Sequence, residues 1–135
     1  PPRPSPTYYA NRMKFMSTKH AFVVYAGPGE PGRVFHALVH AKQAHARGDE
    51  VLTYFAAEGT AWPGLLAQAD HPMHALYQEV ARTGVIQGAC RNCAAAFGNT
   101  ESAGAVCGLI DGPAASAGQI DILGLDDAGY RVWLF

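Results

Sequence analysis

Short apolar runs that end at glycine or polar residues predict the strands of this protein. The run from His20 to Ala26 is rich in β-branched and aromatic side chains and stops at Gly-Pro-Gly, which is typical of a buried strand. By the same criteria we expect further strands over residues 50–56, 85–89, 105–110 and 130–135.

Apolar positions three and four residues apart predict helices between these strands. Over residues 33–47, Val34, Leu38 and Ala41 recur at helical spacing, and Gly48 follows as a terminating glycine. Shorter helices are expected over residues 62–69, over residues 73–83 and from Ala94 onward. Strands that alternate with helices indicate βαβ units with right-handed crossovers. The pattern therefore predicts an α/β fold with a mostly parallel sheet.

The first residues differ in composition from the rest of the chain. Prolines at positions 1, 2, 4 and 6 prevent regular hydrogen-bonded structure, and the apolar core of a signal peptide is missing. We treat residues 1–16 as a flexible N-terminal extension or an expression remnant. The 135-residue length then leaves one domain over residues 17–135, large enough to bury a core without disulfides.

Charge and cysteine content narrow the function classes. A formal net charge of −1 gives no reason to expect nucleic acid or an anionic membrane as a partner. No apolar run approaches the roughly 20 residues of a spanning helix. Three cysteines, two of them in a C-x-x-C, suit a reducing compartment better than a secreted disulfide framework. We expect a cytoplasmic protein with neither a nucleic-acid nor a membrane partner.

Ligands of open α/β sheets bind beyond the carboxyl ends of the strands, here the loops 27–32, 57–61 and 88–93. The first loop, GPGEPG, matches the dinucleotide-binding pattern G-x-G-x-x-G, and Glu58 ends the next strand. However, Pro28 and Pro31 remove two N–H donors that a pyrophosphate would need, and Glu30 adds a negative charge. A turn that starts the helix fits this loop better than a nucleotide site.

The histidines allow a metal site but do not favour one. His36 and His40 are four residues apart on one helix, without the glutamate of H-E-x-x-H, and His45 follows near the helix end. His71 and His74 flank a proline. Structural zinc sites usually pair two Cys or His clusters, and this chain has one C-x-x-C. We therefore predict no metal and no bound cofactor.

The cysteines are the best candidates for chemistry. Cys90 lies where a strand meets a helix, so its sulfur should face the free N–H groups of the first helical turn. This position favours the thiolate, and the adjacent Arg91 is a candidate stabiliser. A thiolate at a strand end suits a nucleophile or a sulfur carrier, although a buried structural cysteine remains an alternative. Cys93 is a candidate second thiol or faces the sheet, and Cys107, in an apolar run, is expected to be a buried core thiol.

The chain resembles the DsrE/DsrF-like family of sulfur-relay proteins over residues 19–135. The matching segments, in order, are KHAFVVYAGPGEPGRVFHALVHAKQAHARGDEVLTYF, HPMHALYQEV, GACRNCAAAFG and AGYRVWLF. In family members the active cysteine ends a strand, small residues follow, and a glycine stands eight positions on. Cys90 and Gly98 keep this spacing, whereas the family's Arg-Arg before the glycine is Ala96-Phe97 here.

The resemblance implies a three-layer sandwich with a five-stranded sheet, assembly into trimers or hexamers, and a persulfide passed between donor and acceptor proteins. The expected function is thus a sulfurtransferase-type persulfide carrier that uses Cys90. Two alternatives remain open: a dithiol oxidoreductase using Cys90 and Cys93, and a non-catalytic oligomeric ligand-binding module. The terminal run Val132–Phe135 presents a large apolar surface, to which Trp62, Phe97 and Tyr77 add. We expect part of this surface to stay exposed as a patch for association.

Overall fold

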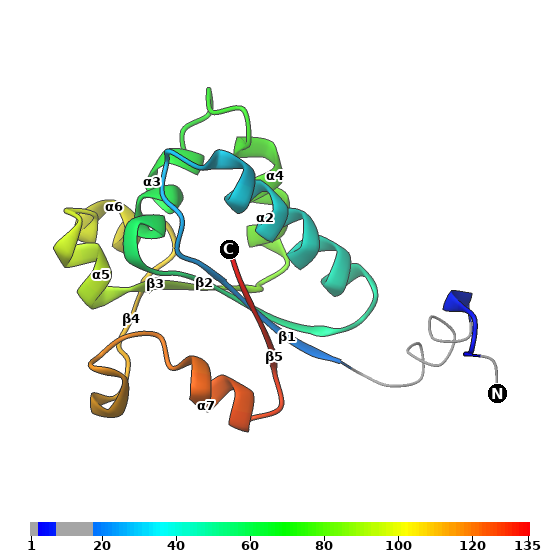
Figure 1. Ribbon diagram of the computed structural model, residues 1–135. Coiled ribbons are helices and arrows are strands. Elements are labelled where there is room, and N and C mark those ends of the chain that lie inside the picture. The colour runs from blue at the N-terminus through cyan, green and yellow to red at the C-terminus, as the bar shows by residue number, and fades with distance from the viewer. Residues whose placement is uncertain (1–2, 8–17) are drawn as a thin grey trace.

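The computed structural model describes residues 3–7 and 18–135, and residues 18–135 form one parallel five-stranded sheet with helices on both faces (Figure 1). The strands are β1 (Lys19–Val24), β2 (Glu50–Phe55), β3 (Ile86–Cys90), β4 (Leu109–Ile110) and β5 (Arg131–Leu134). They lie in the order β4-β3-β2-β1-β5. The predicted α/β class with a parallel sheet is confirmed. Most of the extension predicted over residues 1–16 lies outside the described residues.

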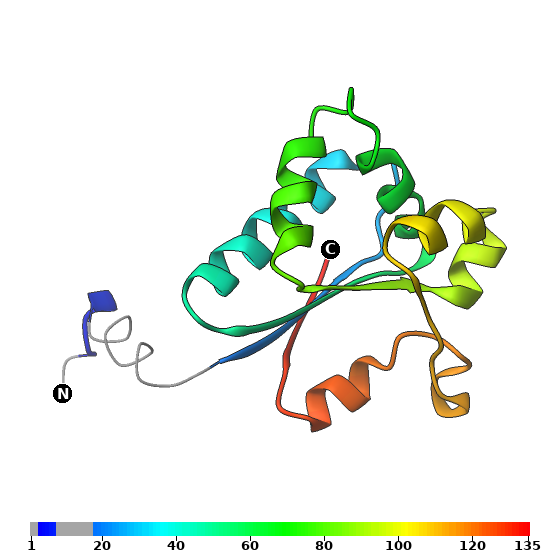
Figure 2. The ribbon, with the colours of Figure 1, turned by 180° about the vertical axis from the view of Figure 1, so that it is seen from behind.

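The direction in which the chain crosses from one strand to the next decides which face of the sheet each helix covers. The α-helices in the described ranges are α2 (Pro31–Ala46), α3 (Trp62–Leu66), α4 (His74–Arg82), α5 (Arg91–Ala96), α6 (Thr100–Val106) and α7 (Ile122–Asp127). From β1 to β4 the chain moves one way, and right-handed crossovers keep α2, α3, α4 and α6 on one face. The return from β4 to β5 runs the other way, so α7 lies on the opposite face (Figures 1 and 2).

Side chains that alternate along the strands divide into two apolar clusters. The larger cluster includes Phe22, Val24 and Phe55 and packs under α2, α3 and α4. The smaller cluster, on the α7 face, contains Val23, Ala56, Cys90 and Ile120. The two faces of the sheet are therefore different environments, and Cys90 lies on the more thinly covered one.

A β-bulge in β3 decides the direction of the Cys90 side chain. Thr53 of β2 is in register with Ile86, but the next residue, Tyr54, is in register with Gly88, so Gln87 is an extra residue. A one-residue shift turns all later side chains to the other face. Ile86 consequently packs against the larger cluster, whereas Cys90 joins the smaller one.

The fourth strand predicted over residues 105–110 is present but shorter than expected. Helix α6 runs through Val106, and β4 is only the pair Leu109–Ile110. Ala103 is the buried residue of α6, whereas Ala105 and Val106 are exposed. A short apolar run does not by itself distinguish a helix from a strand.

Two helix starts also differ from the sequence prediction. The helix expected from Ala94 begins at Arg91, because Cys90 serves as its N-cap. Helix α7 was not predicted, although Asp121 caps it: the Asp121 Oδ1 accepts a hydrogen bond from the Gly124 N–H at 3.0 Å. An N-cap aspartate followed by apolar residues was the available signal.

The expected exposed apolar patch is present at the C-terminal strand. Trp133 and Leu134 remain 46% and 56% exposed, while Trp62 and Tyr77 are buried in the larger cluster. Within the part of the chain that the structure describes, no helix has the length and apolar character needed to cross a membrane.

Candidate thiol site

Cys90 and Cys93 lie at the carboxyl edge of the sheet, where the parallel topology predicts a site. Cys90 ends β3 and is the N-cap residue of α5. The first turn of α5 brings the Cys93 backbone N–H to 3.5 Å from the Cys90 Sγ, which accepts the hydrogen bond. The predicted position of the Cys90 sulfur at a helix start is confirmed.

Cys90 is completely covered in the folded chain. Its exposed fraction is 0%, and its neighbours in the smaller cluster are Val23, Ala56 and Ile120. The turn at residues 118–119 closes the remaining side, since the Cys90 Sγ donates to the Gln119 Oε1 at 3.4 Å and lies 3.9 Å from the Gly118 carbonyl oxygen. A reagent from solvent must displace this turn before it reaches Cys90.

Cys93 is the thiol of the pair that faces solvent, and it is only half-buried. Its Sγ donates to the Gln119 Oε1 at 2.9 Å. Burial raises the pKa of the Cys93 thiol, the neighbouring Cys90 raises it further, and the Ala57 backbone N–H acts against both by lowering it. Cys93 is therefore a protonated thiol at neutral pH, with one N–H group placed to receive its anion.

Gln119 contacts both thiols, and the sequence did not single it out. A tight loop places it: the Gly118 N–H donates to the Pro113 carbonyl at 2.9 Å, and the Gly112 N–H donates to the Gly118 carbonyl at 3.2 Å. Gly118 has a φ of +77°, and a Cβ there would collide with the Asn92 side chain. Only the closure of this loop against α5 brings the amide to the thiols, so no local sequence pattern marks it.

Tyr25 and Ala57 complete the surroundings of the thiols. Tyr25 follows β1, and burial raises the pKa of its phenol, with smaller contributions from Cys93 and Cys90. The phenol therefore stays protonated and can act as a donor beside an anionic sulfur. Ala57 has a φ of 49°, in the left-handed region, in the turn whose N–H group faces Cys93.

Arg91 forms an ion pair with a carboxylate. Its Nε lies 2.7 Å from the Asp111 Oδ1, and both side chains are more than half exposed. Asp111 follows β4, so this pair fastens the start of α5 to the start of the loop that carries Gln119. The structure thus assigns Arg91 a positioning contact, and its effect on a thiolate stays a prediction.

Cys107 lies apart from the other two thiols. It follows α6, packs against the larger cluster on the opposite face of the sheet, and is half-buried rather than fully buried as expected. Burial raises its pKa to about 11, against a lowering by the Ala89 backbone N–H. It cannot join Cys90 and Cys93 in one site without unfolding.

The histidines occupy separate places on the α2 and α4 side. The rings of His36 and His40 stack with centroids 6.0 Å apart, and His45 is exposed. The His71 Nδ1 accepts from the Met73 N–H at 3.0 Å, and the His74 Nδ1 donates to the Leu66 carbonyl at 2.7 Å. Across residues 3–7 and 18–135, no group of three or more His, Cys, Asp or Glu side chains could hold a metal.

The GPGEPG loop forms the turn that the sequence suggested. The Glu30 N–H donates to the Gly27 carbonyl at 2.9 Å, and α2 begins at Pro31. A cavity of about 340 Å³ beside this turn carries the carboxylates of Glu30 and Glu58 and the guanidinium of Arg33. Two acidic groups make it a poor place for a phosphate.

Comparison with known proteins finds no relative of this chain: no family model, no curated protein and no solved structure matches it.

Proposed function

We propose that this protein is a sulfur carrier that takes up a sulfane sulfur at the Cys90–Cys93 pair and passes it to an acceptor protein. The observation that carries the proposal is the shared position of the two thiols. Both donate to one atom, the Gln119 Oε1, at 2.9 and 3.4 Å, at the carboxyl edge of the sheet. One thiol faces solvent and the other is covered, which is the arrangement needed to receive a reactive sulfur and then shield it.

In this proposal Cys93 receives the sulfur. Its thiolate, formed by loss of the thiol proton to solvent, attacks the outer sulfur of a donor persulfide. The donor's S–S bond breaks, its electron pair stays on the donor thiolate, and Cys93 becomes the persulfide. The Ala57 N–H, which favours the anionic form of Cys93, supports this first step.

Cys90 then stores the sulfur. Once Gln119 has moved aside, the Cys90 thiol loses its proton to water, and its thiolate attacks the outer sulfur of the Cys93 persulfide. The S–S bond at Cys93 breaks, its electron pair stays on the Cys93 sulfur, and that thiolate takes up a proton from water. The Cys93 backbone N–H, 3.5 Å from the Cys90 Sγ, is placed to donate to the attacking Cys90 thiolate. Because Cys90 is covered, Gln119 must swing aside for uptake and can close again over the product.

The test is loading with glutathione persulfide, followed by intact and peptide mass measurement. Wild type and the matched control Cys107→Ser should each gain one sulfur, found on Cys90. Cys93→Ser should load at least several-fold more slowly. Cys90→Ser should hold the sulfur on Cys93, where a reductant removes it faster. Equal loading of all four proteins would overturn the proposal.

A dithiol oxidoreductase is the second candidate, and the same proximity favours it. If Cys90 attacks the inner rather than the outer sulfur of the Cys93 persulfide, the products are a Cys90–Cys93 disulfide and free hydrosulfide. A redox titration of the wild type, together with a hydrosulfide assay during loading, distinguishes the two functions. A well-defined disulfide potential with stoichiometric hydrosulfide release would favour the oxidoreductase.

We further propose that the carrier works as a trimer or hexamer in the cytoplasm. The exposed Leu134 and Phe97 support association, since such apolar surface is usually covered by a partner. The three free thiols suit a reducing compartment. Sedimentation velocity at micromolar concentration tests the assembly, and a single monomeric boundary would exclude it.

A further inference from the structure

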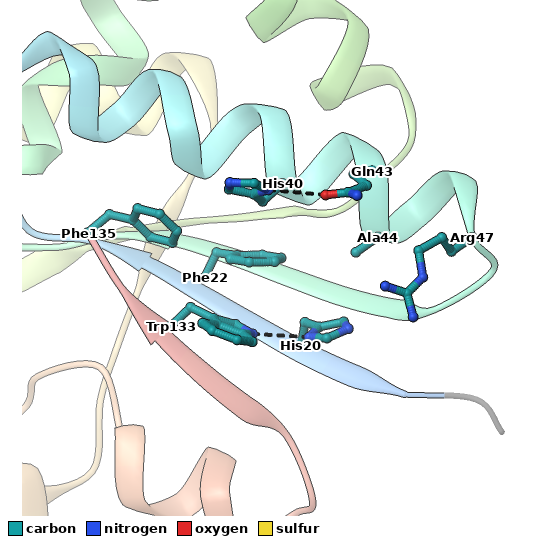
Figure 3. A pocket seen from close by; sticks show the side chains of 8 residues that line it. All are labelled: His20, Phe22, His40, Gln43, Ala44, Arg47, Trp133 and Phe135. Carbon is teal, nitrogen blue, oxygen red and sulfur yellow. Dashed lines mark hydrogen bonds between the residues drawn. The ribbon is translucent and has the colours of Figure 1, made fainter. Parts of the chain in front are cut away.

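A groove of about 410 Å³ lies on the face of the sheet opposite the thiol pair (Figure 3). It runs between the C-terminal half of α2 and strands β1 and β5. Phe22, His40, Trp133 and Phe135 supply its aromatic walls, and Gln43 and Arg47 stand at its rim. Its volume falls within the range of about 300–1,000 Å³ that is usual for small-molecule sites.

The aromatic side chains of the groove contact one another in sequence. The rings of His40 and Phe135 have centroids 6.5 Å apart, and those of Phe135 and Phe22 are 6.0 Å apart. Figure 3 shows the rings of His40, Phe22 and Trp133 nearly edge-on, one below another, between α2 and β5. A flat ring system can lie against such a surface over a large area.

A buried hydrogen-bond chain fixes this surface. The Trp133 Nε1–H donates to the His20 Nδ1 at 3.1 Å, and because an indole nitrogen can only donate, the Nδ1 of His20 carries no proton. The proton of neutral His20 is therefore on Nε2, which donates to the Asp49 Oδ2 at 3.0 Å. The side chains of His20 and Asp49 are only 8% and 4% exposed.

The same chain reaches the rim through Arg47. The Arg47 Nε lies 3.5 Å from the Asp49 Oδ2, so the carboxylate that orients His20 also holds the guanidinium. Burying a histidine and an aspartate costs desolvation free energy, whereas burying apolar residues in their place would not. The hydrogen-bond chain holds Trp133 in place and positions the Arg47 guanidinium beside it, and a preformed site of this kind binds with a smaller ordering cost.

The rim presents hydrogen-bond donors. The His40 Nδ1 donates to the Gln43 Oε1 at 3.1 Å, which occupies the oxygen of that amide and leaves its nitrogen as the donating end. Arg47 adds the terminal nitrogens of its guanidinium, which points from the end of α2 toward His20 in Figure 3. Donors with a positive charge, next to aromatic walls, complement an anion on a flat apolar body.

We infer that this groove binds a small planar aromatic carboxylate, with its rings against Trp133 and Phe135 and its carboxylate at Arg47 and Gln43. The inference is independent of the sulfur-carrier proposal, because no residue of the groove belongs to the thiol site.

The binding test uses 2-naphthoate as the probe and 2-naphthylmethanol, of the same shape without the charge, as its comparison. The chain has two tryptophans, of which Trp62 is buried and Trp133 faces the groove, so their indole N–H signals in a nitrogen–proton correlation spectrum serve as reporters. Naphthoate should shift the Trp133 signal saturably and leave the Trp62 signal in place. Calorimetry supplies the affinity of each probe.

Matched variants separate the charge from the rings. Arg47→Gln should weaken naphthoate binding about tenfold, the size expected for a lost charged hydrogen bond at a partly exposed side chain, and leave naphthylmethanol unchanged. The control Arg82→Gln removes an exposed arginine at the end of α4 and should change neither. Trp133→Ala should weaken both probes alike, with the Trp62 signal as the check that the variant is folded.

Three results would overturn the inference. Equal binding of the acid and the alcohol would remove the carboxylate assignment, and the absence of saturable binding to either would remove the site. A Trp133 signal that moves with protein concentration and not with naphthoate would show that a second copy of the chain covers the groove. The double variant Cys90→Ser/Cys93→Ser should bind naphthoate like the wild type, so failure of the sulfur-carrier proposal would leave the groove proposal standing.

Discussion

The side-chain oxygen of Gln119 accepts a hydrogen bond from the Cys93 thiol at 2.9 Å, across 26 residues of sequence. The same oxygen lies 3.4 Å from the Cys90 sulfur, so one amide engages both thiols and covers the inner one. Gln119 itself is exposed at the surface. It is therefore placed to act as a movable cover.

Removal of the Gln119 amide should uncover Cys90. In Gln119→Ala we expect Cys90 to react with iodoacetamide at least several-fold faster than in wild type, because the group that closes its open side is gone. Peptide mass measurement after timed quenching follows each cysteine separately. Gln68→Ala, at an exposed position away from the thiols, is the control and should leave all three rates unchanged. An unaltered Cys90 rate in Gln119→Ala would show that other atoms seal the thiol.

In wild type the three thiols should react in the order Cys93, then Cys90 and Cys107. The sequence favoured a thiolate at Cys90 because of its helix start, but the Cys90 sulfur has no exposed surface. Cys107, with a pKa of about 11, is a thiolate in only about one molecule in ten thousand at pH 7. The raised pKa of Cys93 means that its rate should still climb above the pH at which an ordinary thiol reaches its plateau. A Cys90 rate that exceeds that of Cys93 in the folded protein would contradict this order.

Cys107 should make the protein sensitive to alkaline pH. Its folded-state pKa of about 11 exceeds the ordinary 9.0, so the folded state holds the proton more tightly. The stabilisation is complete below pH 9 and is lost as pH rises from 9 to 11, by about 2 kcal/mol at most. Tyr77, whose pKa is also raised by burial and by Cys107, acts in the same direction.

Urea unfolding at several pH values between 8 and 11 measures this loss. Cys107→Ala should be less stable than wild type at pH 8 but should lose less stability on the way to pH 11. Parallel pH curves for the two proteins would show that Cys107 does not carry the effect.

Gly88 should tolerate no side chain, because it forms the bulge that directs Cys90. Its φ is +150°, and an added Cβ would lie 2.9 Å from both the Gly108 carbonyl oxygen and the Ile110 Cγ1. We expect Gly88→Ala to lower the free energy of unfolding by about 2–4 kcal/mol. An added Cβ at Gly29 would meet none of the described atoms within 4 Å, so Gly29→Ala should change stability little and serves as the control. Denaturant midpoints of the wild type and the two variants measure the effect. Equal midpoints for the wild type and Gly88→Ala would show that the bulge relaxes to accept a side chain.

Local patterns in the sequence predicted most strands and the long helix, for a physical reason. Strands of a parallel sheet are buried on both faces, so β1 and β2 appear as nearly continuous apolar runs that end at turn residues. Helix α2 buries only one of its own faces, so Val34, Leu38 and Ala41 recur at the three- and four-residue spacing of an amphipathic helix. The small residues of α6 carry no such contrast, so the helix over Thr100–Val106 is seen only in the folded structure.

The sequence by itself determined which residues are candidates for chemistry and at which edge of the sheet they lie. Strand-to-helix order places Cys90 and Cys93 at a carboxyl edge, whatever the details of packing. Regular alternation along β3, however, would have pointed Cys90 to the same face as Ile86. The extra residue Gln87 turns it to the other face, and that bulge depends on pairing with β2, which no local pattern reports. The cover over Cys90 likewise comes from Gln119, whose loop closes only against the folded α5. Tertiary structure therefore decided which thiol is covered and which one meets solvent.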